Sequence, residues 1–276
     1  MSVTAMVPLA SLGLVLVSVT LLWALSIMLR DVSIIDRVFA LILLGVAVLA
    51  AALGVSPGWV RWSLAGLVGV WAVRLTVHLL ARSRGQGEDP RYSKLREWRD
   101  EGWPFHRFVY RQVFLLQGMT LWLVSLPLQL AATVDRPVLP LWINVTGVGV
   151  ALAGVLIEAI ADLQLQRFRR DPSNHGRVLD EGLWRYSRHP NYFGELTFWW
   201  GLFVAALIHP LVLAAVVGPL AYSLLVIRVT GKATLEKRLR RRREGYDQYV
   251  ERTGAIIPRR PRTSSVASVA DTRGRS

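Results

Sequence analysis

Long apolar stretches alternate with shorter polar joints along most of the chain. A helix needs about 20 mostly apolar residues to cross the hydrocarbon core of a bilayer, and seven stretches are about that long or longer. The predicted spans cover residues 6–29, 34–54, 58–81, 107–133, 139–165, 191–209 and 211–230. We therefore predict an all-α, polytopic membrane protein with about seven transmembrane helices.

Basic residues are concentrated in alternate joints between these spans. Of the 33 Lys and Arg residues, eight lie in 82–111, six in 166–190 and fourteen from Arg228 onward. Two more, Arg30 and Arg37, lie in the joint after the first span, whereas the alternate joints hold only Arg61 and Arg136. Because basic loops stay on the cytoplasmic side, this distribution predicts an external N-terminus and a cytoplasmic C-terminus, which requires an odd number of spans.

Composition excludes several classes of chemistry. The chain has no cysteine, which rules out disulfides, thiolate nucleophiles and Cys-ligated metal centres, and we predict no metal site. A soluble Rossmann dehydrogenase is excluded, because no glycine-rich dinucleotide motif follows a strand. The net charge of +14 resides mainly in the basic joints, so we expect membrane lipids rather than nucleic acid as partners.

The chain is expected to form one transmembrane domain, residues 1–258, followed by a disordered basic tail, residues 259–276. The tail is polar and lacks apolar periodicity. The first apolar run is too long for a signal-peptide core, so we expect it to be retained as a helix. The basic stretch 232–252 either contributes to a functional site or is a surface segment held by anionic lipids.

Four polar residues recur along the end of the fifth predicted span. Glu158, Asp162, Gln166 and Arg169 are spaced i, i+4, i+8 and i+11, which places them on one helix face near the cytoplasmic boundary. Two carboxylates one turn apart repel each other unless a donor lies between them, which favours a ligand or an arginine from elsewhere. The alternative is a helix end that reaches the interface with its own internal pairs.

The stretch "YSRHPNYFGE" precedes the sixth predicted span. Pro190 suits the first turn of a helix, so this span is predicted to start there. Arg185, Arg188 and His189 come just before it, at a helix N-terminus, where anions bind well. A phosphate-bearing cofactor would fit this arrangement, with Glu195 about one turn inside; the alternative is a helix start that faces lipid headgroups.

A third group of polar residues belongs to the first half of the chain. Arg74 and His78 are spaced i, i+4 on the third predicted span, and the motif "EDPRY" follows in the long joint after it. A buried histidine is more often structural than catalytic, but its pKa range suits proton donation near neutral pH. His78 is therefore a candidate proton donor.

Three motifs together resemble a known family. "GLWRYSRHPNYFGE", the preceding "AD" and glutamine of the fifth span, and "GYDQYVERTGAIIP" are similar to the steroid 5-alpha-reductase-like membrane proteins, in their bacterial DUF1295 branch. The resemblance is strongest over residues 150–258, and "RHPNY" followed by glycine is also similar to sterol C14-reductases.

The resemblance implies an NADPH-dependent reductase of an activated carbon–carbon double bond, with the cofactor held by residues 150–258 and entering from the cytosol of a bacterial cell. The substrate would be a hydrophobic or lipid-like molecule, such as a sterol, a fatty enone or a polyprenoid. Transferred by motif and combined with the helix-start site, the expected cofactor-binding residues are Asp162, Arg169, Tyr186, Arg188, His189, Asn191, Tyr192, Glu195, Tyr246 and Tyr249.

The chain departs from the steroid reductases at the substrate carbonyl. Those enzymes use a glutamate and a tyrosine on their second and third helices, whereas the second span here has no interior carboxylate and the third offers Arg74 and His78. We therefore expect His78 to be the catalytic donor. The rival class is a membrane methyltransferase that holds S-adenosylmethionine at a similar helix start, and a non-enzymatic lipid carrier is a third hypothesis.

Overall fold

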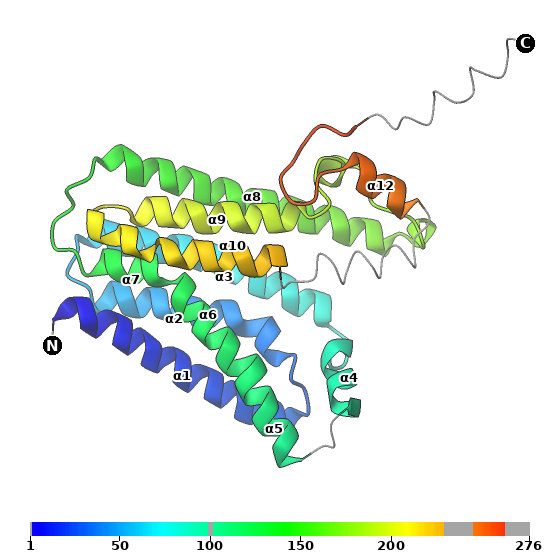
Figure 1. The fold of residues 1–276 in the computed structure, drawn as a ribbon, viewed down its shortest axis with the longest axis horizontal. Coiled ribbons are helices and arrows are strands. Elements are labelled where there is room, and N and C mark those ends of the chain that lie inside the picture. The colour runs from blue at the N-terminus through cyan, green and yellow to red at the C-terminus, as the bar shows by residue number, and fades with distance from the viewer. Residues whose placement is uncertain (1, 99–101, 229–244, 263–276) are drawn as a thin grey trace, which may run out of the picture. The chain divides into compact units, whose positions relative to one another are not determined.

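A computed structural model describes residues 2–98, 102–228 and 245–262. Most of the basic stretch 232–252 and of the predicted tail 259–276 lies outside these residues. The described chain is helical and has no β-strand, apart from an isolated bridge between Ser187 and Gly254. The all-α prediction is thus confirmed (Figure 1).

The longer helices are α1 (Val3–Leu29), α2 (Ile34–Leu53), α3 (Gly58–Ser83), α4 (Pro90–Trp98), α5 (Trp103–Val109), the π-helix η1 (Tyr110–Leu115), α6 (Leu116–Val124), α7 (Leu126–Ala132), α8 (Leu141–Arg170), α9 (Pro190–Ala206), α10 (Val217–Arg228) and α12 (Tyr246–Arg252). Short 3-10 turns connect them: η2 (Pro172–Asn174), η3 (Gly182–Arg185) and η4 (Pro210–Val216).

Several described helices are long and apolar enough to cross a membrane. They are α1, α2, α3, α8 and the continuous helix Pro210–Ile227, and a sixth is reached if the bent segment from Trp103 to Ala132 is one span. The chain is therefore a multi-pass membrane protein. α9 occupies the remaining predicted interval, but its 17 residues fall just short of the 18 that the other spans reach. The count of seven and the orientation stay predictions.

The fourth predicted span, 107–133, is broken rather than straight. Its two parts, ending at Val124 and starting at Leu126, are bent by 47°. Pro127 lies in the first turn of α7, a position that tolerates proline. In an uninterrupted helix its ring would clash with the carbonyl four residues earlier, and the bend avoids that clash. The sequence contained this proline, and the bend follows from it.

Contacts divide the chain into two compact units, which are described separately. Unit 1 comprises Met1–Ala151 and Trp199–Tyr222, and unit 2 comprises Leu152–Phe198 and Ser223–Ser276. In unit 1, α2 packs against both α1 and α3 (Figure 1). Large apolar side chains such as Leu21 and Val77 remain exposed on these helices, as expected for surfaces that face lipid.

Glycines bring α8 and α9 into backbone contact. In unit 2, a Cβ atom on Gly194 would lie only 2.5 Å from the backbone nitrogen of Glu158, and one on Gly154 would overlap the backbone of Phe198. The pattern repeats in unit 1, where Gly201 meets Ala151 in the same way. Small residues of this kind let membrane helices approach closely. The close approach in unit 2 sets the positions of the polar side chains described next.

Candidate functional site

Two buried carboxylates of α8 lie opposite the start of α9 in unit 2. Glu158 and Asp162 are 3% and 8% exposed, and the Asn191 amide of α9 donates to the Asp162 carboxylate at 3.5 Å. Carboxylates are rarely buried unless partners or a ligand compensate for the lost water. The structure therefore brings Asn191 next to Asp162, although 29 residues separate the two in the sequence.

The start of α9 presents a stacked pair of rings. The helix begins at Pro190, as predicted. His189 is 4% exposed, and its imidazole stacks on the Tyr192 ring with centroids 5.3 Å apart and planes 15° apart. Glu195 follows one turn later and is half-buried. These side chains offer a flat aromatic surface and a carboxylate beside the Asp162 and Asn191 pair.

Arg188 fastens this helix start to the C-terminal segment. Its guanidinium donates to the carbonyls of Val250 and Thr253 at 2.9 and 2.7 Å, and its backbone N–H donates to Gly254 at 2.8 Å. The side chain is 8% exposed. The sequence predicted Arg188 as an anion ligand; these contacts show a positioning role that sequence reasoning missed.

Tyr246 and Tyr249 of α12 are buried, and Tyr249 contacts the loop that precedes α9. The Tyr249 hydroxyl donates to the carbonyl of Trp184, and the two tyrosine rings lie 5.9 Å apart. Burial, together with the neighbouring Tyr246, raises the pKa of the Tyr249 phenol, so the hydroxyl keeps its proton and its donor role even at alkaline pH. Ser187 adds a bond of 2.7 Å from its hydroxyl to the carbonyl of Ile256.

The loop before α9 is also attached to α8. The Trp184 indole donates to the carbonyl of Ala161 at 3.1 Å, and the Gln164 side chain accepts from the backbone of Leu183 at 3.0 Å. Gly182 has a positive φ of 56° and lies against Gln164 with no room for a Cβ atom. In the sequence, Gln164 was noted only as part of a motif. Its hydrogen bond with Leu183 indicates that it positions the loop.

Arg169 and Tyr186 lie at the edge of this arrangement. Arg169 is exposed in the last turn of α8. Tyr186 is 43% exposed, and its carbonyl accepts from the backbone of Arg259 at 3.0 Å. Both predicted ligands are thus open to solvent, unlike Asp162 and His189.

An arginine-lined pocket of about 560 Å³ lies in the same unit. Arg252 forms an ion pair with Asp180 at its rim, while Arg185 and Arg262 are exposed. The remaining lining residues include Glu181, Gly182, Thr253 and Pro261. We call this cavity the arginine pocket. Its Gly182 is the residue that contacts Gln164, so the pocket borders the loop that is attached to α8.

His78 belongs to unit 1 and lies half-buried on α3. Trp71, Arg74 and His78 are spaced i, i+3 and i+7, which places them on one face of the helix. Trp71 is fully buried, and its ring lies 5.1 Å from that of Trp199, which in turn lies 5.8 Å from Tyr222. His78 therefore shares a helix face with an aromatic cluster.

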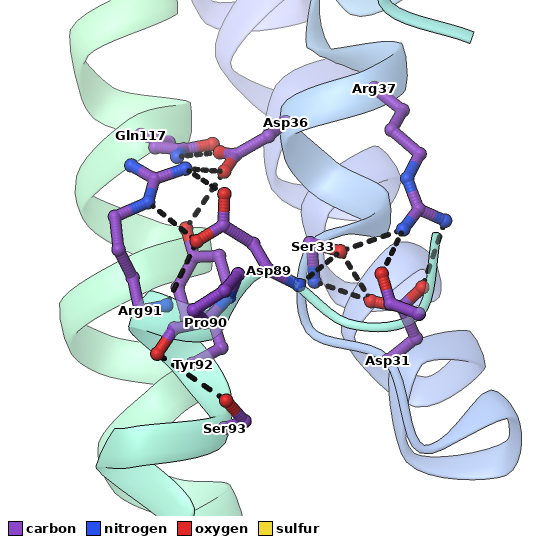
Figure 2. Close-up of polar contacts among 11 residues, drawn as sticks. Asp31, Ser33, Asp36, Arg37, Asp89, Pro90, Arg91, Tyr92, Ser93 and Gln117 are labelled. Atoms are coloured by element: carbon purple, nitrogen blue, oxygen red, sulfur yellow. Dashed lines mark hydrogen bonds and ion pairs between the residues drawn. The ribbon is translucent and has the colours of Figure 1, made fainter. Parts of the chain in front are cut away.

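The motif "EDPRY" docks onto the first turn of α2 (Figure 2). Asp36 accepts from Arg91 at 2.8 Å, from the Tyr92 hydroxyl at 3.1 Å and from Gln117 at 2.9 Å. Burial and the Asp36 charge raise the pKa of Tyr92. For Asp89, burial alone would raise the pKa, but the hydrogen bonds and the charge of Arg91 outweigh it, so that the pKa of this carboxyl is lowered. We call this the Asp36 network.

One family match covers both halves of the chain described above. The profile of DUF1295, described as a protein of unknown function, matches residues 22–253, which is most of the chain. The chain belongs to the DUF1295 family. No curated protein and no solved structure matches it. The DUF1295 membership expected from the motifs is thus confirmed, whereas the relationship to steroid 5-alpha-reductases stays a prediction. The matched residues include both the Asp36 network and the polar residues of α8 and α9.

Within this DUF1295 protein, the donor set of unit 2 suits a polar organic ligand. No cluster of metal-ligating side chains occurs among the residues that the structure describes. Carboxylates such as Asp162 accept from hydroxyl groups, arginines bind phosphates, and the His189 and Tyr192 rings can stack on a planar base. Buried groups that are fixed by packing orient such a ligand with little loss of entropy.

Proposed function

We propose that this chain is an NADPH-dependent membrane reductase, which acts on an activated, enone-type carbon–carbon double bond of a lipid or steroid-like substrate. The observation that carries the proposal is the part-buried contact between Asp162 and Asn191 beside the stacked rings at the start of α9. The motif resemblance names the cofactor class, and the bacterial branch of that resemblance supports the bacterial inner membrane as the location.

The residues of unit 2 fit the chemical groups of a phosphorylated dinucleotide. Asp162 and Glu158 supply acceptors for ribose hydroxyls, as acidic residues do in other dinucleotide sites. Arg185 and Arg262 of the arginine pocket supply charge for phosphate. His189 and Tyr192 supply a stacking surface. Arg188, Tyr249 and Gln164 would act by holding the loops that carry these groups.

Reduction of an enone requires a hydride and a proton donor. When bound, the reduced nicotinamide supplies a hydride for the β carbon of the enone. A protein group has to polarise the carbonyl oxygen and a proton has to reach the α carbon; we assign this donor role to His78. Apolar helices keep bulk water away from such a site and accommodate a hydrophobic substrate.

Ligand selectivity tests the cofactor assignment. Purified protein in detergent is expected to respond to NADPH more strongly than to NADH or S-adenosylmethionine, measured by nicotinamide fluorescence and thermal shift. Replacing both Arg185 and Arg262 with glutamine should weaken NADPH binding by at least about 100-fold, because two charge-assisted bonds of about 1.5–3 kcal/mol each are lost. NADH binding should change much less, since it lacks the extra phosphate.

Arg260 provides the matched control, because it is exposed, close in sequence to Arg262 and absent from the pocket lining. Arg260→Gln should leave both affinities unchanged. A response to S-adenosylmethionine alone would overturn the reductase proposal in favour of a methyltransferase. Full NADPH selectivity in the double variant would remove the arginine pocket from the cofactor site.

His78→Phe separates binding from turnover. The aromatic ring fills a similar volume but has no exchangeable proton, so NADPH affinity should stay nearly intact while reduction of an enone-containing lipid stops. Both quantities are measured on the same preparation, with His175→Phe as a control because His175 is exposed in unit 2. Unchanged turnover in His78→Phe would remove this residue from the mechanism.

A further inference from the structure

A second pocket lies in unit 1, where α2 begins and α3 ends. Its volume is about 270 Å³, far above the roughly 10–15 Å³ that a cavity needs to hold one water molecule. The lining residues come from the first turn of α2, the last turn of α3 and the loop that carries "EDPRY". They include Asp36, Arg37, Leu79, Arg82, Glu88 and Asp89.

The carboxylates around this pocket already have strong donors (Figure 2). Asp36 accepts three hydrogen bonds in the Asp36 network. Glu88 pairs with Arg96 at 2.9 Å and accepts from the backbone of Val32 at 2.8 Å. Asp89 pairs with Arg91 at 3.0 Å. These carboxylates are therefore poorly placed to bind a cationic ligand.

The arginines that line this pocket differ in their acidic partners. Arg37 pairs with Asp31 at 2.8 Å, and Arg91 pairs with Asp36 and Asp89. For Arg82, by contrast, no hydrogen bond or ion pair is found within the described part of the chain, although its charge contributes to the lowered pKa of Asp89. Arg82 is exposed and lines the pocket, so its charge is available to an anion.

The place of the pocket along the helices indicates which anion it meets. α2 starts at Ile34 and α3 ends at Ser83, so the pocket lies where apolar helix gives way to polar loop, the depth at which lipid phosphates occur. Leu79, one turn inside Arg82, adds an apolar wall suited to the glycerol and upper chain of a lipid. Basic residues at this depth attract anionic lipids.

We propose that this pocket binds the phosphate group of a phospholipid, with Arg82 as its charged anchor and Leu79 against the apolar part. The Asp36 network holds the loop in place before the lipid arrives, which lowers the entropy lost on binding. This proposal does not rest on the reductase activity, because the pocket lining includes neither His78 nor any of the proposed cofactor-binding residues.

The test titrates full-length protein in neutral detergent with phosphatidylglycerol, and measures the thermal shift and the lipid retained in native mass spectrometry. Arg82→Gln is expected to weaken phosphatidylglycerol binding at least about tenfold, as for the loss of one charge-assisted bond. Arg82→Lys should retain most of the affinity, since lysine binds phosphate as a point charge. Phosphatidylglycerol affinity retained in Arg82→Lys would show that the loss in Arg82→Gln is not a folding defect.

Arg84→Gln is the matched control, because Arg84 is exposed two residues away and does not line the pocket. General attraction to the lipid surface predicts at most about a fivefold loss for this variant. Equal losses in Arg82→Gln and Arg84→Gln would overturn the proposal. Diacylglycerol, which lacks phosphate, should not bind the pocket, and a thermal shift by inorganic phosphate equal to that by the lipid would overturn the lipid as the source.

Discussion

Replacing Asp162 with alanine is expected to weaken NADPH binding by at least about 100-fold. Asp162 is almost fully buried next to Asn191, and each hydrogen bond that a buried carboxylate makes to a ligand contributes about 1.5–3 kcal/mol, so the loss of two such bonds reaches this size. Asn191→Ala should cost about tenfold, because an amide is neutral. Nicotinamide fluorescence in detergent measures both affinities.

The same variant should not lose stability in the absence of the cofactor. Glu158 and Asp162 lie one turn apart on α8, and like charges at this spacing repel each other. Removing one of them relieves the repulsion, so the melting temperature of cofactor-free Asp162→Ala should equal or exceed that of the wild type. Groups that are kept for binding at the expense of stability behave in this way.

Glu251→Ala serves as the control, since Glu251 is an exposed carboxylate of α12 in the same unit. It should change neither affinity nor melting temperature. If both Asp162→Ala and Asn191→Ala retained NADPH affinity, the assignment of these two residues to the cofactor site would be contradicted, whatever the activity of the protein proves to be.

The membrane helices could be predicted from the sequence because apolar length is a strong signal. The start of α9 could be predicted too, because Pro190 has a position-specific preference. The bend near Pro127 was missed, since a proline inside an apolar run is compatible with either a kinked or an interrupted span. The end of α9 at Ala206 was also placed a few residues too late, because apolar residues continue into the next turn.

The site was predictable only in part, and the reason lies in the kind of contact. The shared face of Glu158 and Asp162 follows from helix geometry alone. The contacts of Arg188 could not be predicted, because its acceptors are main-chain carbonyls more than 60 residues away, and every residue carries such a carbonyl. Asp36 was missed for a related reason: in the sequence it is an ordinary acidic residue at a helix start, and its partners Tyr92 and Gln117 are distant.

Glycine spacing carried information that the sequence analysis did not use. Gly147 and Gly154 on α8 are seven residues apart, as are Gly194 and Gly201 on α9, so each pair lies on one helix face. Spacing alone does not say which helix a glycine face meets. In the structure, each of these glycines lies against the backbone of the other helix within its own unit. The arrangement of Asp162 and Asn191 in unit 2 therefore depends on residues that have no side chains.

Gly194→Ala should destabilise the protein by about 1–3 kcal/mol, the usual cost of overpacking, and Gly194→Leu should prevent unit 2 from folding correctly. The added Cβ would lie 2.5 Å from the Glu158 nitrogen and 2.8 Å from the Gly154 carbonyl oxygen, and neither backbone atom can turn aside as a side chain can. Melting in detergent, followed by tryptophan fluorescence, measures the loss of stability.

Gly149→Ala on α8 is the contrasting variant, because a Cβ atom there meets nothing within 4 Å. Alanine favours a helix over glycine by up to about 1 kcal/mol, so this variant should be as stable as the wild type or more so. If Gly194→Ala instead matched Gly149→Ala in stability, α8 and α9 would not be in backbone contact at the site. Since the distance from Asp162 to Asn191 is set by that contact, the folded fraction of Gly194→Ala should also bind NADPH more weakly, which links the packing of two membrane helices directly to the proposed chemistry.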